Sequence, residues 1–209
     1  MKQRNKQNTN PYALLLIAVM ALCLAIIGST LFSTSGKGKG GHVPTVEDTD
    51  DEDWITKQYL TPNDYSRSQK TLDSVEGIVV HYVANPGSTG WDNWHYFENL
   101  KDTHETKASS HFIIGLDGTI IQCMPLNEVA YCSNERNWDT ISIECCHPKK
   151  NGKFTKETYK SLIKLCRFLM EEYDLSSSDV IRHYDVTGKI CPKYFVDHPD
   201  AWEDFLSEL

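Results

Sequence analysis

The pattern that most constrains the fold is the alternation of short apolar segments with amphipathic ones. The run Ile78-Val79-Val80-His81-Tyr82-Val83 is almost continuously apolar and β-branched, which is typical of a strand buried on both faces. Residues 140–146 have the same character. Between 156 and 173, apolar side chains recur every three or four positions, which predicts a helix lying on a sheet and capped by Thr155. The alternation predicts a single α/β domain with a central mixed sheet flanked by helices.

Weaker patterns complete this domain, which we expect to span residues 54–209. The turn Leu116-Asp117-Gly118 predicts a hairpin between residues 109–115 and 118–123, with His111 and Ile113 on one face and Phe112 and Ile114 on the other. Helices are predicted at 91–101, with Trp91, Trp94 and Phe97 on one face, and at 200–209. Residues 179–182 are expected to form a short strand, and residues 54–74 an irregular lead-in.

A separate element precedes the domain. Residues 12–32 carry no charge and, as a helix, would span roughly 30 Å, about the thickness of the hydrocarbon core of a bilayer. The basic flank at 1–11, with Lys2, Arg4 and Lys6, predicts a cytoplasmic N-terminus. We therefore expect a single-pass protein of the cell membrane whose domain lies on the extracytoplasmic side.

Two other interpretations of this apolar run are a cleaved signal peptide and a lipoprotein signal. The run is longer than a secretory apolar region of about 7–15 residues, and it ends in Gly28-Ser29-Thr30-Leu31-Phe32, a poor match to a cleavage site. Cys23 would be the lipidated residue of a lipoprotein, but Leu22 stands where a small residue is needed. An uncleaved anchor is favoured.

Residues 33–53 have the composition of a flexible tether. The first half is rich in Gly, Lys and Ser and the second half is acidic, so neither half can bury a core. A flexible coil of about 20 residues would hold the domain on the order of 25 Å from the membrane surface.

Charge and cysteine content narrow the possible partners. The net charge of −8 argues against nucleic acid as a partner, because phosphate binding needs clustered Lys and Arg. No repeat or second domain is apparent, and we expect a monomer. The seven cysteines show no disulfide-framework spacing. Cys145 and Cys146 should face opposite sides of a strand, and a Cys123–Cys132 disulfide across a hairpin stays open.

The chemistry centres on the segment from Arg182 to Pro192. Seven residues separate His183 from Cys191, and Gly188 and Pro192 predict a turn rather than a helix between them. An imidazole and a thiolate on the two limbs of a loop can converge on Zn²⁺. Taken alone, this segment favours a structural histidine and an inert, buried cysteine over a metal site.

Two apolar strands carry further ionisable groups. His81 ends one strand and His183 follows another, so His81, His183 and Cys191 could meet at one sheet edge as the three ligands of a catalytic zinc. The open fourth position would hold a water whose pKa falls to about 7. Glu144, on the strand at 140–146, is then the natural general base, and Lys189 a cation for the developing oxyanion.

Four motifs in this order resemble one known family, the zinc-dependent N-acetylmuramoyl-L-alanine amidases of type 2, which are related to peptidoglycan recognition proteins. The resemblance covers about residues 77–192. It is carried by Ile78-Val79-Val80-His81-Tyr82-Val83-Ala84-Asn85, Ser110-His111-Phe112-Ile113-Ile114-Gly115-Leu116-Asp117-Gly118-Thr119-Ile120, Ile141-Ser142-Ile143-Glu144 and His183-Tyr184-Asp185-Val186-Thr187-Gly188-Lys189-Ile190-Cys191-Pro192.

The resemblance implies a Zn²⁺ cofactor and hydrolysis of the amide bond between N-acetylmuramic acid and L-alanine in peptidoglycan or muropeptides. It implies Zn²⁺ binding by His81, His183 and Cys191, water activation by Glu144 and carbonyl polarisation at Lys189. An alternative is a non-catalytic peptidoglycan-binding module of the same fold. Such modules commonly lack the cysteine, and Cys191 is present.

Three further residues have a less defined role in this resemblance. Some relatives have a catalytic tyrosine where this chain has Ser110, which places the catalytic role on Glu144. His111 matches a strand histidine that is structural or faces the substrate. Asp185 is expected to brace the turn before Cys191 or to orient an imidazole from behind.

Overall fold

The structure, a computed structural model, describes residue 49 and residues 52–209. The predicted membrane anchor at 12–32, its basic flank and most of the tether therefore lie outside the described residues. Among the helices of the described part, none has the length and apolar character needed to cross a membrane.

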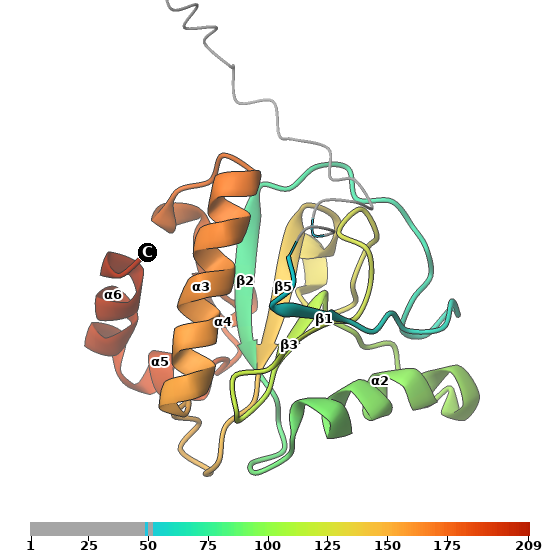
Figure 1. Ribbon diagram of the computed structural model, residues 1–209, viewed down its shortest axis with the longest axis horizontal. Helices are drawn as coiled ribbons and strands as arrows, with labels where there is room; N and C mark the ends of the chain where they lie inside the picture. Colours follow the sequence, from blue (N-terminus) through green and yellow to red (C-terminus); the bar gives the residue numbers. More distant parts are fainter. Residues whose placement is uncertain (1–48, 50–51) are drawn as a thin grey trace, which may run out of the picture. The chain divides into compact units, whose positions relative to one another are not determined.

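The described residues form a six-stranded mixed sheet in the order β1-β4-β3-β5-β2-β6 (Figure 1). The antiparallel pair is β3–β4, and the other neighbouring pairs are parallel. The predictions of a mixed sheet and of a hairpin at Asp117-Gly118 are confirmed. The strands are β1 (Ile55–Lys57), β2 (Gly77–Tyr82), β3 (Phe112–Ile114), β4 (Ile120–Gln122), β5 (Thr140–Cys145) and β6 (Val180–Arg182).

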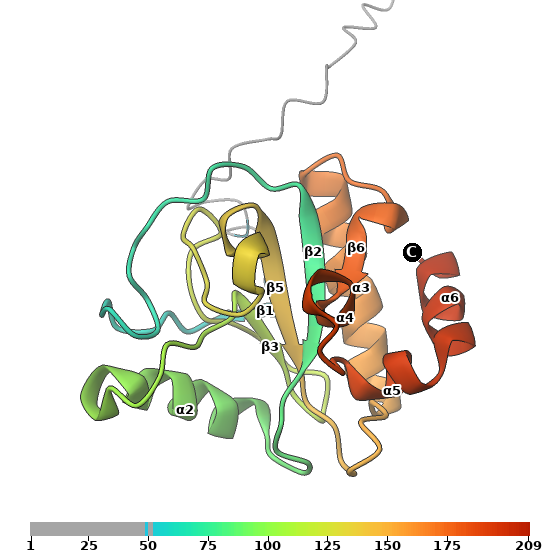
Figure 2. The ribbon, with the colours of Figure 1, turned by 180° about the vertical axis from the view of Figure 1, so that it is seen from behind.

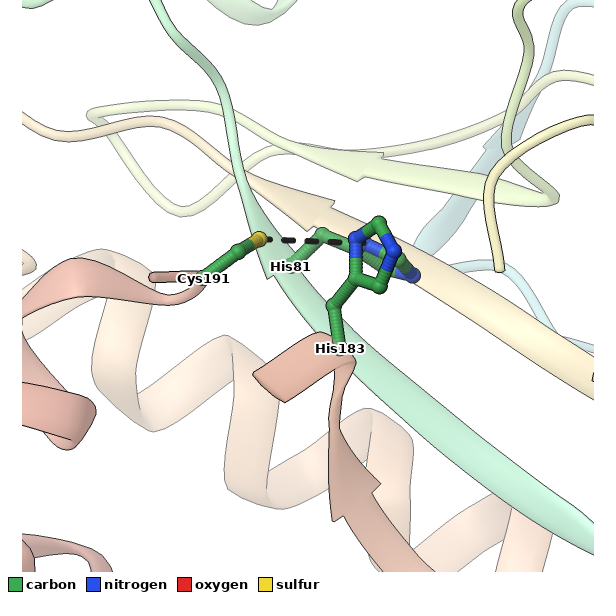
Figure 3. A group of neighbouring side chains, drawn as sticks. All are labelled: His81, His183 and Cys191. Carbon is green, nitrogen blue, oxygen red and sulfur yellow. Dashed lines mark hydrogen bonds between the residues drawn. The ribbon is translucent and has the colours of Figure 1, made fainter. Parts of the chain in front are cut away.

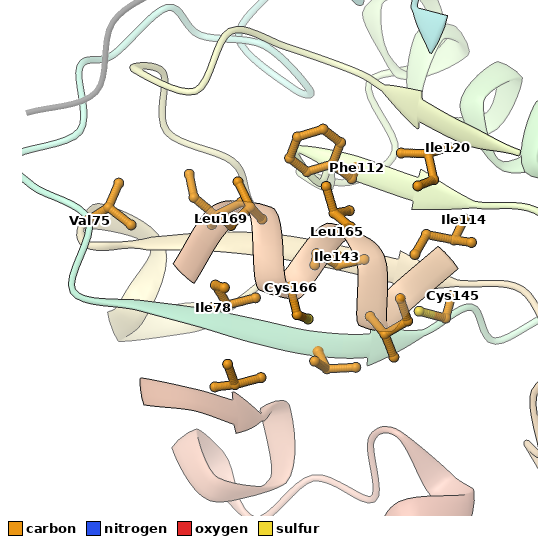
Figure 4. Packing of buried hydrophobic residues seen from close by; sticks show 14 of the residues in the cluster. Val75, Ile78, Phe112, Ile114, Ile120, Ile143, Cys145, Leu165, Cys166 and Leu169 are labelled. Atoms are coloured by element: carbon orange, nitrogen blue, oxygen red, sulfur yellow. The ribbon is translucent and has the colours of Figure 1, made fainter. Parts of the chain in front are cut away.

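Helix α3 (Lys156–Glu172) covers one face of the sheet, as its periodicity predicts. Its N-cap is Thr155, whose side chain accepts a hydrogen bond from the Thr158 backbone. Figure 4 shows the apolar side of α3 packed against the central strands, and the residues buried there include Ile78, Ile114, Ile143, Leu165, Cys166 and Leu169.

Helix α2 (Gly90–Thr103) lies on the opposite face (Figure 2) and buries Trp94, Phe97 and Leu100. The prediction that Trp91 joins this face is wrong, because Trp91 is 41% exposed. The two faces separate neighbouring residues as strand alternation requires: Ile113 packs on the α2 side, and Phe112 and Ile114 pack on the α3 side.

The cysteines follow the same division. Cys145 packs in the α3 cluster and Cys146 in the α2 cluster. Cys123 and Cys132 are both free, so the disulfide left open by the sequence is not formed.

Two parts of the predicted fold need correction. The lead-in at 54–74 contains β1, a three-residue edge strand that pairs with β4. The segment after β6 is not a simple turn: it begins with a short helix, α4 (His183–Thr187), and α5 (Lys193–Asp197) and α6 (Pro199–Ser207) follow. Two 3-10 turns, η1 (Asn134–Trp138) and η2 (Ser177–Asp179), also went unpredicted.

Helix α4 owes its bounds to local hydrogen bonds. Arg182 is its N-cap, and the Asp185 carboxylate accepts the Arg182 backbone N–H at 2.9 Å. Gly188 ends the helix with φ +77°, in the left-handed region that glycine adopts without strain. The chain then reverses, so that the Tyr184 N–H donates to the Cys191 carbonyl at 2.9 Å.

Candidate metal centre

Three donor side chains from distant segments converge at the carboxyl ends of β2 and β6 (Figure 3). His81 lies near the end of β2, and the adjacent β6 leads directly into His183. The Nδ1 atoms of His81 and His183 lie 3.1 Å apart, and the Cys191 Sγ lies 3.8 Å from the His81 Nδ1. All three side chains are buried. The structure thus brings together the three residues that the sequence predicts as metal ligands.

The donor set fits zinc in chemistry and in spacing. Zn–N bonds of 2.0–2.1 Å and Zn–S bonds of 2.3 Å, arranged tetrahedrally, separate two nitrogens by about 3.3 Å and a nitrogen from a sulfur by about 3.6 Å. The observed separations of 3.1 and 3.8 Å are close to these values. The three donor atoms lie within 4.8 Å of one another, so the two imidazoles and the thiolate could hold one Zn²⁺.

Burial also favours the protonation states that a metal ligand needs in the two histidines. It lowers the pKa of His81 well below the usual histidine range, and the neighbouring His183 and Lys189 lower it further. Burial likewise lowers the pKa of His183, so both imidazoles are neutral at pH 7.

The pKa of Cys191 shifts in the opposite direction, away from the charged form that binds a metal. Burial, together with the nearby Glu144, raises the pKa of its thiol to about 12. A thiolate at this position therefore needs a cation beside it, because ligand deprotonation and metal binding are coupled.

Each histidine has a partner on its outer nitrogen as well. The His81 Nε2 lies 3.1 Å from the Ser133 hydroxyl, and the His183 Nε2 lies 2.8 Å from the Asn134 side-chain oxygen. Both partners come from the loop between β4 and β5. Nothing in their sequence spacing separates them from other loop residues, so only the folded structure reveals them.

The centre opens into a cleft of about 400 Å³. Glu144 reaches it from β5, where it is the register partner of His81 on β2. The cleft is lined by His81, Phe97, Lys107, Ala108, Ser109, Tyr131, Cys132, Asn134, Asn137, Glu144, His183 and Lys189.

The Glu144 carboxyl group is buried at the cleft and has a raised pKa. Its Oε1 accepts a hydrogen bond from the Cys132 thiol at 3.5 Å, while its Oε2 is buried without a protein partner. Burial raises the pKa of Glu144 to about 7, although the Cys132 hydrogen bond and the Lys189 charge act in the opposite direction. A carboxyl group with these properties can accept and return a proton near neutral pH. Cys132, which the sequence suggested only as a disulfide partner, thus belongs to the site.

Lys189 and Asp185 occupy the α4 side of the centre. Lys189 is exposed and lines the cleft, where it supplies positive charge. Asp185 binds the Arg182 backbone and guanidinium, so it braces the start of α4. Of the two roles expected for Asp185, these contacts match the bracing role.

Ser110 and His111 lie away from the cleft. Ser110 donates its hydroxyl to the Phe112 carbonyl at 2.8 Å. The His111 Nδ1 lies 3.1 Å from the Ser142 hydroxyl, and its Nε2 lies 2.9 Å from the Glu128 carbonyl. Both residues are fully buried, so their placement favours structural roles over substrate contact.

Comparison with known proteins identifies the family of this chain. A family model described as N-acetylmuramoyl-L-alanine amidase matches residues 71–194. The N-acetylmuramoyl-L-alanine amidase CwlL of Bacillus licheniformis is 34% identical over 169 residues, which cover 74% of this chain and 46% of CwlL. BlyA of Bacillus subtilis, an enzyme with the same description, is 30% identical over 180 residues and has the same coverage.

Solved structures show the same fold. The catalytic domain of XlyA superimposes with a TM-score of 0.62 at 25% identity, covering 74% of this chain and 97% of that domain. A mutant endolysin from Bacillus subtilis gives a TM-score of 0.62 at 26% identity, with the same coverage. The chain spans about half the length of the curated relatives that it matches. Since the family model covers more than half of its residues, the chain belongs to the N-acetylmuramoyl-L-alanine amidase family.

Proposed function

We propose that this protein is a zinc-dependent amidase that cleaves the bond between N-acetylmuramic acid and L-alanine in peptidoglycan. The observation that carries the proposal is the convergence of His81, His183 and Cys191 at a cleft that is also lined by Glu144 and Lys189. Membership of the family and the names of its relatives support the choice of bond and substrate.

In this proposal His81, His183 and Cys191 hold the zinc ion. Bound zinc would polarise the scissile carbonyl and lower the pKa of a bound water. Glu144 accepts a proton from the attacking water as the new carbon–oxygen bond forms, and returns it to the alanine nitrogen as the carbon–nitrogen bond breaks. The products are a carboxylate on the muramic acid lactyl group and a free α-amine on L-alanine.

The surroundings of Glu144 suit this role. The Cys132 thiol engages Oε1 and Oε2 has no protein partner, so in this proposal Oε2 takes the proton of the attacking water. Lys189 faces the same cleft from the loop after α4, and its ammonium group stabilises the negative charge that develops on the carbonyl oxygen.

Digestion of purified sacculi tests the proposal. We expect new N-terminal alanine with no new reducing sugar ends, one bound zinc per chain, and loss of the product in Cys191→Ala. Reducing ends would indicate a glycosidase, and the absence of any product would indicate a binding module. Full activity in metal-free Cys191→Ala would overturn the proposed zinc chemistry.

We also propose that residues 12–32 anchor the protein in the cell membrane, with the domain outside and residues 33–53 as its tether. The support is the charge-free run and its basic N-terminal flank. Protease treatment of intact cells from which the outer wall has been removed should cleave the domain and leave a cytosolic marker intact. Protection of residues 201–209 under those conditions would show that the orientation is reversed.

A further inference from the structure

We infer that Asn134 is a positioning residue for His183: its side-chain oxygen holds the imidazole proton on Nε2, so that the Nδ1 lone pair points into the metal centre. The inference rests on the proposed zinc function, and it concerns a residue that makes no contact with the reacting atoms. The observation behind it is the distance of 2.8 Å between the Asn134 Oδ1 and the His183 Nε2.

The two histidines differ in the kind of partner they have. An amide oxygen only accepts hydrogen bonds, so Asn134 admits one neutral tautomer of His183, the one with its proton on Nε2. A hydroxyl both donates and accepts, so Ser133 tolerates either tautomer of His81. The Nδ1 lone pair of His183 is thus fixed toward the metal centre, while His81 can change tautomer, from a proton on Nδ1 to a proton on Nε2, when a cation binds.

The contact between the two rings agrees with this assignment. The Nδ1 atoms lie 3.1 Å apart, which requires either a proton or a cation between them. With the His183 proton held on Nε2, its Nδ1 is the acceptor, and the His81 Nδ1–H is the donor. Metal binding would free the His81 Nδ1 by a change of tautomer: the ring would carry its proton on Nε2, facing the Ser133 hydroxyl, with no net loss of a proton, and the Asn134–His183 hydrogen bond would stay intact.

The backbone of the loop places Asn134 for this contact. Asn134 has φ +54°, in the left-handed region. Apart from glycine, asparagine is one of the few residues that adopt this conformation readily. The Asn137 side-chain oxygen accepts the backbone N–H groups of Cys132 at 3.0 Å and Ser133 at 2.6 Å. These bonds fix the two residues before Asn134.

Asn134 is exposed, whereas His183, the residue it contacts, is 4% exposed. Replacing Asn134 should therefore remove little packing. Loss of a partner that orients a metal-bound histidine typically weakens metal affinity by 10–100-fold. Asn134→Gly removes the acceptor oxygen, and glycine adopts the left-handed backbone conformation without strain. We expect this variant to bind zinc about 10–100-fold more weakly.

The experiment measures zinc affinity by chelator competition and the histidine tautomers by ¹⁵N NMR of the metal-free protein. Asn134→Asp retains an acceptor oxygen and should bind zinc much more tightly than Asn134→Gly. Asn151→Gly is the matched control, an exposed loop asparagine whose side chain accepts only from the nearby Lys153 backbone among its described contacts. It should leave zinc affinity unchanged.

The outcomes separate this inference from the proposed function. The inference would be overturned if NMR of the metal-free wild-type protein found the His183 proton on Nδ1. It would also be overturned if Asn134→Gly bound zinc as tightly as the wild-type protein does. Failure of the wild-type protein to bind zinc at all would instead count against the proposed function, whatever the tautomer of His183.

Discussion

The Nδ1 atoms of His81 and His183 lie 3.1 Å apart although 102 positions separate the two residues in the sequence. The parallel pairing of β2 with β6 produces this proximity, because it places the carboxyl ends of both strands at one edge of the sheet. The site is thus built into the sheet, and only Cys191 depends on the loop that follows α4.

Removal of the metal should destabilise the domain. Zinc at 100 times its Kd should add about 3 kcal/mol to the free energy of unfolding, because it binds the folded state selectively. Urea titrations with zinc or with a chelator measure this difference. In Cys191→Ala it should largely vanish, whereas Cys166→Ala, which alters a cysteine on the buried side of α3, should retain it. An equal zinc response in both variants would exclude Cys191 as a ligand.

Replacing Glu144 with glutamine should separate metal binding from catalysis. Glu144→Gln keeps the shape of the side chain but removes the basic oxygen, so we expect normal zinc content and a rate lower by roughly 10²–10⁴-fold. Muropeptide hydrolysis followed by chromatography gives the rate. Glu171→Gln, on the exposed surface of α3, is the control and should be unaffected. An unchanged rate in Glu144→Gln would assign the base to another group.

Lys189 should contribute to the rate through its charge. Lys189→Met retains most of the side-chain length without the ammonium group, and loss of one oxyanion-stabilising donor typically lowers the rate by about 10²–10³-fold. Lys189→Arg should recover part of that loss. If kcat is unchanged in Lys189→Met and only KM rises, Lys189 acts in substrate binding instead.

His111 should make stability depend on pH. Burial lowers the pKa of His111 to about 4, below the value of about 6.5 expected in the unfolded chain. Between these pH values the unfolded state binds a proton that the folded state excludes, so the free energy of unfolding falls as pH decreases from 6.5 to 4. The loss attributable to His111 is about 3 kcal/mol and is complete near pH 4.

The measurement is urea unfolding of the chelator-treated protein at pH 7 and at pH 4.5. His111→Gln should show a smaller difference between the two pH values than the wild type, even if it is less stable at both. His95→Gln, which replaces an exposed imidazole on α2, should keep the wild-type difference. The same pH dependence in all three proteins would show that the His111 imidazole is not the source.

Asp185 should act on the helix rather than on the metal. Asp185→Ala removes the hydrogen bonds to Arg182 that start α4, and loss of such a cap typically costs about 1 kcal/mol. We expect this loss in urea titrations with and without zinc. A loss seen only with zinc would indicate that Asp185 orients His183. Asp197→Ala, which breaks an exposed pair with Lys193, should change stability by less than about 0.5 kcal/mol.

Several elements were predictable because their signals are local. The three-to-four-residue rhythm and the Thr155 cap define α3, and Asp117-Gly118 defines the hairpin. Strand β1 was not predictable, because three residues carry no usable period and their ladder comes from β4, far along the chain. Helix α4 was also missed, because Gly188 and Pro192 predict a chain reversal without showing that one helical turn fits before it.

The candidate site divides in a similar way. By itself, the sequence determined which side chains could bind a metal or activate a water. His81 and His183, the predicted ligands, and Glu144, the predicted base, are ionisable groups in or next to apolar strands, and Cys191 closely follows His183. Only the tertiary structure decided that Cys132 contacts Glu144 and that Ser133 and Asn134 contact the imidazoles. Strand identity follows from the burial preferences of neighbouring residues, whereas the path of an irregular loop depends on hydrogen bonds with segments far away in the chain.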